Sequence, residues 1–234
     1  DRLEEHCELI ARHFSHSTAS AKALDYLEFA NAKARRANAV FDAKAHFEEA
    51  MRALDALPDN AEYRARRIAL LVAQVHVFIL TNALLEYERY LEANVHRAQT
   101  LDNTGLRGHF DACRGHCQFY AGRPIEASKT LRDAAMTCER AGNFEGAGHA
   151  YAHLVWSQLQ RGEYEAALEY EGPALRVLDR APNLRLRVYA MTAASWACAN
   201  LGLCDAAIDK AQAARSEAER AGEAGLVCFA GWIL

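Results

Sequence analysis

The sequence predicts an all-α fold, a solenoid of stacked antiparallel helix hairpins with about 40 residues in each repeat. The two residue types that most disrupt helices are scarce, with 4 Pro and 13 Gly among 234 residues. Apolar residues recur every three or four positions, and no stretch alternates strictly as a half-buried strand does. The turn signals are themselves periodic, because Gly122, Gly162 and Gly202 stand 40 residues apart.

Each of these glycines begins the same short pattern, with an alanine five residues later and another seven residues after that. The alanines are Ala127 and Ala134, Ala167 and Ala174, and Ala207 and Ala214. A second turn signal keeps the same step at Gly142, Pro182 and Gly222. Each repeat therefore consists of two helical segments of about 20 residues, and its small side chains let neighbouring helices approach closely.

The first part of the chain replaces the turn glycine by asparagine, at Asn38 and again at Asn82. After glycine, asparagine is the residue that most readily ends a helix with a positive φ. We therefore expect a positive φ at both positions.

In chain order, we expect leading helices that form a junction over 1–37, repeats over 38–221 and the truncated start of a further repeat over 224–234. Together they form one solenoid of about twelve helices over 1–234. The helices are expected near 2–15, 20–37, 40–57, 60–81, 83–101, 104–121, 124–141, 144–161, 164–180, 183–201, 204–221 and 224–234. Pro124 suits a helix start, where its missing N–H costs nothing. Gly172-Pro173 falls inside the ninth helix and should kink or split it.

Composition narrows the class of protein. Hydrophobic residues are 51% and charged residues 25%, which is ordinary for a globular domain. The net charge of −4 argues against a nucleic-acid partner, and no segment approaches the roughly 20 apolar residues of a membrane span. The 7 cysteines are odd in number and scattered, which favours reduced, buried thiols. We expect a cytoplasmic helical module that has no membrane partner and is cut from a longer chain.

Motifs for catalysis are missing from the sequence. It has no phosphate-binding loop, no dinucleotide-binding glycine pattern and no Gly-x-Ser-x-Gly nucleophile turn. Acidic pairs such as Glu48-Glu49 fall on helix faces expected to be solvated. We therefore expect the chain itself to be no enzyme and to bind no cofactor.

The segment Gly162-Glu-Tyr-Glu-Ala-Ala167, with Ala174 seven residues on, resembles the tetratricopeptide repeat. Asn38 to Ala43, with Phe47 and Ala50, is similar. The resemblance implies a right-handed superhelical solenoid. Its longer period resembles the C-terminal part of bacterial signalling ATPases that are linked to adenylate or guanylate cyclases or to transcription regulators. Residues 10–54 resemble the junction between ATPase core and repeats in the cyclase-linked group. This implies a regulatory module whose parent protein carries the ATPase or cyclase.

In such solenoids the first helix of each hairpin lines the concave face, and the resemblance places side chains of this chain there by their distance from each turn. The implied groove residues are His76, His116, Trp156, Trp196, His109, His149, Tyr189, Tyr120, Gln160 and Asn200. An aromatic groove with few charges suits a peptide or protein partner, an apolar ligand or another domain of the same parent chain. The alternative is that Trp156 and Trp196 pack between helices.

A second pattern concerns metal ligands. His109 and Cys113 are four residues apart on one first helix, and His149 and His153 are four apart on the next. Such pairs can each supply two ligands to one ion, and zinc accepts imidazole and thiolate in a tetrahedral arrangement. These four residues form a hypothetical metal or small-molecule sensor site. The alternative is that they line the groove or pack. His116 and Cys117 are not expected to join the same ion from one straight helix.

The chain ends at Leu234 within an apolar run, with no polar cap after it. We expect either a further repeat beyond it or a homodimer through this end.

Overall fold

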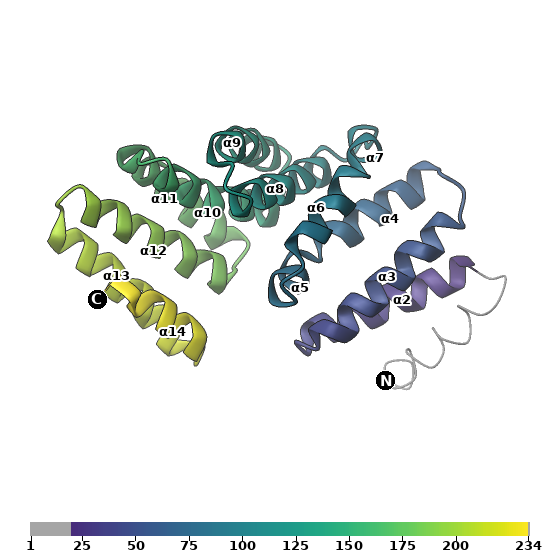
Figure 1. Cartoon of the computed structure of the whole chain (residues 1–234), viewed down its shortest axis with the longest axis horizontal. Coiled ribbons are helices and arrows are strands. Elements are labelled where there is room, and N and C mark those ends of the chain that lie inside the picture. Colours follow the sequence, from purple (N-terminus) through teal and green to yellow (C-terminus); the bar gives the residue numbers. More distant parts are fainter. Residues whose placement is uncertain (1–19, 234) are drawn as a thin grey trace. The chain divides into compact units, whose positions relative to one another are not determined.

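A computed structural model describes residues 20–233, in which helices are joined by short turns and no strand occurs (Figure 1). The all-α fold class is therefore confirmed. The helix expected near 2–15 lies outside the described residues. The chain divides into two compact units, with the boundary between Asn103 and Thr104. The continuity of one solenoid across this boundary remains a prediction of the repeat spacing.

The first unit consists of short hairpins around an aromatic core. Its helices are α2 (Ser20–Arg36), α3 (Val40–Asp55), α4 (Ala61–Val72), α5 (Val75–Leu80), α6 (Leu84–Glu92) and α7 (Val95–Gln99). The rings of Phe47 and Phe78 lie 5.5 Å apart edge to face, and Phe78 stacks on Tyr87 at 5.0 Å. All three side chains are fully buried, which stabilises the fold by roughly 1.5–3 kcal/mol for each ring.

The prediction of one helix over 60–81 was wrong, because the helix ends at Val72 and resumes at Val75. The buried side chains of Gln74 and Asn31 pair with each other, through bonds of 2.9 and 3.1 Å. Arg35 donates to the carbonyl oxygen of Ala73 at 3.0 Å, which satisfies a backbone group that the break leaves without its helical partner.

The single helix expected over 83–101 is likewise divided, into α6 and α7, at Ala93-Asn94. The Asn94 side-chain amide donates to the carbonyl oxygen of Tyr90 at 2.8 Å. An asparagine that bonds to the carbonyl four residues back competes with the backbone ladder, which accounts for the interruption.

The second unit consists of three regular hairpins and a short fourth. Its helices are α8 (Thr104–Tyr120), α9 (Pro124–Arg140), α10 (Phe144–Gln160), α11 (Tyr164–Arg180), α12 (Leu184–Asn200), α13 (Cys204–Arg220), α14 (Ala224–Ala230) and the 3-10 helix η1 (Gly231–Ile233). Helices α8 to α13 lie within a residue or two of their predicted bounds. The first helices of successive hairpins contact one another directly, α8 with α10, α10 with α12 and α12 with α14.

Of the kink or split predicted at Gly172-Pro173, the split does not occur, since α11 continues from Tyr164 to Arg180. The buried side chains of Ala174, Val177 and Leu178 hold the half after the proline in the core. Their burial offsets the loss of one backbone hydrogen bond.

The turns confirm the role of asparagine. Asn38 and Asn82 have φ of 55° and 53°, close to the 71–75° of the five turn glycines. The two asparagines therefore adopt the left-handed helix end that the repeat requires.

Small residues set the spacing between helices of the second unit. The six repeat alanines expected at helix contacts are all buried. Gly146 on α10 marks a close contact between first helices, because a Cβ there would lie 2.9 Å from the Cβ of His109 on α8. It would also lie 2.8 Å from the sulfur of Cys138 on α9. Only glycine lets α10 approach both helices in this way.

We predict that Gly146→Ala destabilises the protein by about 1–3 kcal/mol, because α8 or α9 must shift to admit the methyl group. The measurement is the midpoint of urea unfolding. Gly225→Ala is the matched control, since this helical glycine has no heavy atom within 4 Å of the added Cβ. Equal midpoints for the two variants would contradict the prediction.

Candidate functional site

The second unit carries all but one of the groove residues expected from the sequence. The exception is His76, which is half-buried on α5 of the first unit. The others come from three first helices: His109, His116 and Tyr120 on α8, His149, Trp156 and Gln160 on α10, and Tyr189, Trp196 and Asn200 on α12. They form two layers, one partly exposed and one buried.

The partly exposed layer is a connected set of rings, here called the aromatic row: Tyr120, Tyr189, Trp156, Phe229, Trp196 and Trp232. Tyr189 is central to it, stacked on Trp156 at 4.8 Å and on Phe229 at 5.6 Å. The hydroxyl oxygens of Tyr120 and Tyr189 lie 3.4 Å apart.

The row continues through Trp196, whose ring lies 6.0 Å from Trp156 and 5.9 Å from Trp232. Trp156 also donates its indole N–H to the carbonyl oxygen of Tyr189 at 2.9 Å. The tryptophans therefore pack between helices and also keep a partly exposed surface. Sequence reasoning missed Phe229 and Trp232, because it followed complete repeats and these residues lie in the truncated one.

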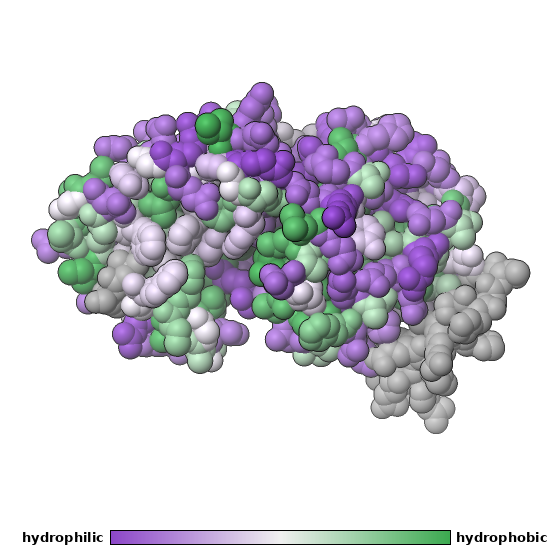
Figure 2. Space-filling view, viewed as in Figure 1, coloured by the Kyte–Doolittle hydropathy of each residue, from purple (hydrophilic) through white to green (hydrophobic). Residues whose placement is uncertain are grey.

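The ends of the row are its most accessible part. Trp232 is 73% exposed and Tyr120 is 48% exposed. Gln160 and Asn200 are exposed at the C-terminal ends of their helices. In the view of Figure 2 the surface over α12 and α14 carries pale and green side chains, whereas much of the upper edge over α9 and α11 is purple. In this view the surface over α12 and α14 is therefore less hydrophilic than the upper edge.

The buried layer is a set of four histidines and a cysteine between α8 and α10, here called the histidine cluster: His109, Cys113, His116, His149 and His153. Each of the five is less than 9% exposed. His149 is central, with its Nε2 2.9 Å from Nδ1 of His116 and its Nδ1 3.9 Å from the sulfur of Cys113. The His116 and His153 rings lie 3.8 Å apart.

The four predicted metal ligands do not all gather around one point. His109, Cys113 and His149 have ligand atoms within 4.8 Å of one another, and His153 lies instead with His116 and His149. Sequence reasoning had set His116 apart from the ligand set. The signal that could have found it is its spacing of seven residues from His109, which places both on one face of α8.

Burial holds these imidazoles in the neutral form. It lowers the pKa of His116 and His149 well below 6.5, and neighbouring histidines add to the effect. Burial lowers the pKa of His153 to about 4, although its bond to the His149 carbonyl oxygen acts in the opposite direction. Burial also lowers the pKa of His109, against the attraction of Glu145.

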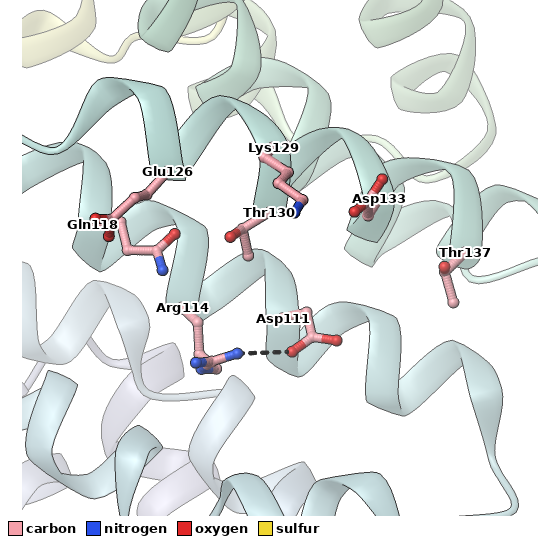
Figure 3. A pocket seen from close by; sticks show the side chains of 8 residues that line it. All are labelled: Asp111, Arg114, Gln118, Glu126, Lys129, Thr130, Asp133 and Thr137. Atoms are coloured by element: carbon pink, nitrogen blue, oxygen red, sulfur yellow. Dashed lines mark hydrogen bonds and ion pairs between the residues drawn. The ribbon is translucent and has the colours of Figure 1, made fainter.

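A separate, open pocket lies between α8 and α9 (Figure 3). Its walls are polar, with Asp111, Arg114 and Gln118 on one side and Glu126, Lys129, Thr130, Asp133 and Thr137 on the other. Asp111 and Arg114 pair across 3.4 Å, and burial raises the pKa of Asp111. The mixed charges of these walls favour no single class of ligand, so the pocket is a weaker candidate than either layer.

No protein-family model matches the sequence, and no curated protein matches it. Solved structures do share its fold. A Rap protein complexed with Competence and Sporulation Factor superposes with a TM-score of 0.74 at 13% identity, over 94% of this chain and 60% of its own. A signal transduction ATPase with a tetratricopeptide repeat sensor, from Pyrococcus horikoshii, gives 0.62 at 17% identity, over 98% of this chain and 36% of its own.

A kinesin light chain with tetratricopeptide-like repeats, from Podospora anserina, gives a TM-score of 0.53 at 14% identity and covers 94% of this chain. These likenesses confirm the tetratricopeptide-like repeat fold expected from Gly162 to Ala174. The chain spans about 60% of the length of the Rap protein and 36% of the length of the ATPase.

The histidine cluster predicts a dependence of stability on pH. Because the folded-state pKa values are lowered, the unfolded chain binds more protons below about pH 6.5. The stability is thus complete above pH 6.5 and falls as the pH decreases toward 4, by up to about 1.4 kcal/mol per pH unit for each buried histidine. Urea unfolding at a series of pH values, with a chelator present, measures this slope.

His153→Gln should have a shallower slope than the unchanged chain over the same interval, since one proton-binding difference is removed. The exposed His96 provides the control, and His96→Gln should leave the slope as it is. Identical slopes for the unchanged chain and for His153→Gln would show that His153 does not contribute to the pH dependence of stability.

Proposed function

We propose that this chain is a non-catalytic interaction and regulatory module of a larger signalling protein, and that it binds a peptide or protein segment on the aromatic row. The observation that carries the proposal is the row itself. Its six rings come from α8, α10, α12, α14 and η1 of the second unit, and they remain at least partly exposed. Tryptophan and tyrosine are the residues that most often anchor binding partners, because they bury much area and keep a polar edge.

The chemistry of the row favours a partner with apolar or aromatic side chains. Burial raises the pKa of Tyr189, so its hydroxyl stays neutral and can donate or accept. The uncharged side chains of Gln160 and Asn200 are exposed at the ends of α10 and α12 and can bond to a peptide backbone. The partner is a separate protein or another domain of the same parent chain. We propose no nucleic-acid partner, because the net charge is −4.

The comparisons support a regulatory role. The neighbours include a Rap protein solved with Competence and Sporulation Factor and an ATPase whose repeats are described as a sensor. We propose a similar place for this chain, as the sensor part of a cytoplasmic bacterial signalling ATPase that is linked to a nucleotide cyclase or a transcription regulator. None of the described helices is long and apolar enough to cross a membrane.

A partner bound on the row can regulate an attached domain through the shape of the repeats. Each hairpin contacts mainly its neighbours, so small changes at successive contacts add along the stack. The partner must bind one shape of the repeats more tightly than another for this to control activity.

The test uses peptides selected from a random library displayed on phage, with the whole chain as bait. We predict that Trp232→Ser weakens the selected peptides at least tenfold, the loss of about 1.4 kcal/mol typical of an anchoring residue. Isothermal titration measures the affinity, and the circular dichroism spectrum reports folding. Trp232 is 73% exposed, so its substitution leaves the core intact.

Ile125→Ser is the matched control, because Ile125 is 72% exposed in the same unit but lies on α9, a second helix. Its variant should keep full affinity. Two outcomes would show that the aromatic row is not the binding surface. In the first, the selected peptides bind Trp232→Ser as tightly as the unchanged chain. In the second, their affinity falls equally in Trp232→Ser and Ile125→Ser.

A further inference from the structure

We propose that His116, His149 and His153 form a binding site for one divalent transition-metal ion of the zinc class. The inference does not depend on the proposed peptide-binding function, because it concerns the buried histidine cluster and not the aromatic row. The three side chains come from α8 and α10, and each is less than 5% exposed.

The geometry of the three rings suits one ion. Each histidine has a ring nitrogen within 4.8 Å of the chosen nitrogens of the other two, and Nδ1 of His116 lies 2.9 Å from Nε2 of His149. Imidazole nitrogens bind zinc at about 2.0–2.1 Å, which places two ligands of a tetrahedral site about 3.4 Å apart. Only small side-chain shifts separate the observed distances from that arrangement.

The tautomer of His153 is already that of a ligand. Its Nδ1 lies 2.9 Å from the carbonyl oxygen of His149, and a carbonyl oxygen can only accept a hydrogen bond. Nδ1 therefore carries the proton, and Nε2 has its lone pair available for a metal ion. A backbone carbonyl that fixes the other ring nitrogen is the usual support of a metal-binding histidine.

The described residues do not provide a hydrogen-bond partner for every ring nitrogen of the histidine cluster. Nε2 of His116 is buried and has no hydrogen-bond partner among the described residues. A buried polar atom without a partner costs about 1–3 kcal/mol. A metal ion binds imidazole through the ring nitrogen that carries no proton. When Nδ1 of His116 and Nε2 of His149 both bind the ion, the proton between them moves to the opposite nitrogen of its own ring, and both imidazoles stay neutral.

The ligand types of the site determine the class of metal that it would bind. Three imidazoles without a carboxylate suit zinc, copper, nickel or cobalt and are unsuited to calcium or magnesium. Three protein ligands leave one position open for water or for a ligand group. The ring of Tyr120 stacks on His116 at 4.9 Å and is 48% exposed, so the site lies one ring below the surface.

The alternative ion site uses His109, Cys113 and His149, and it shares His149 with the proposed one. The two sites would use opposite nitrogens of that ring, because Nδ1 faces Cys113 and Nε2 faces His116. The fixed tautomer of His153, with its Nε2 available, favours the three-histidine site.

The test is titration of the chelator-treated whole chain with zinc chloride, followed by calorimetry and by metal analysis after dialysis. We expect about one equivalent to bind, and the affinity to fall at least tenfold in His116→Gln and in His153→Gln. His96→Gln and the Cys204→Ser/Cys228→Ser double variant alter only exposed potential ligands and should bind as the unchanged chain does.

No zinc bound by the unchanged chain would overturn the proposal, as would unchanged affinity in both histidine variants. Loss of binding in Cys113→Ser but not in His116→Gln would place the ion in the alternative site. The absorption spectrum of the cobalt form of the unchanged chain decides the question even if a variant fails to fold. Tetrahedral d–d bands without a thiolate charge-transfer band would support the three-histidine site. A thiolate charge-transfer band would contradict it.

Discussion

The close approach of successive first helices is the constraint on which the rest of the second unit depends. At Gly146 the backbone of α10 lies so near His109 of α8 that no side chain fits between them. The same approach brings the ring of His149 between Cys113 and His116, and so creates the histidine cluster. One repeat later, the contact of α10 with α12 stacks Trp156 on Tyr189 and continues the aromatic row.

Packing requirements alone do not explain the histidine cluster. Leucine or alanine at these positions would fill the space between α8 and α10 without any polar atom to satisfy. The next contact between first helices shows this solution, since α10 and α12 pack through buried residues such as Val155, Ala193 and Ala197. Four imidazoles at one contact carry a cost in desolvation and make the unit sensitive to acid. The metal site that we propose would account for this cost, whereas packing would not.

The regular second unit was predictable because each repeat repeats the same local rule. Glycine at the turns and alanine at the contacts are both visible as spacing, and the first unit keeps the turn signal with Asn38 and Asn82 in place of glycine. The breaks in the first unit were not predictable in this way. The apolar pattern runs unbroken through Ala73, and the break is held by Asn31, a residue 43 positions from Gln74 in the chain. Periodicity describes one helix at a time and does not contain such contacts.

The same limit applies to the site. Spacing identified His109, Cys113, His149 and His153 as ligand types, but their grouping depends on the rotation and distance of two helices, which Gly146 sets. Residues of the histidine cluster also contact the aromatic row. Tyr120 stacks on His116, and the ring of Tyr189 lies 5.1 Å from His153. Two rings of the aromatic row, Tyr120 and Tyr189, therefore rest directly on the histidine cluster. The positions of these two rings therefore depend on how the imidazoles beneath them pack.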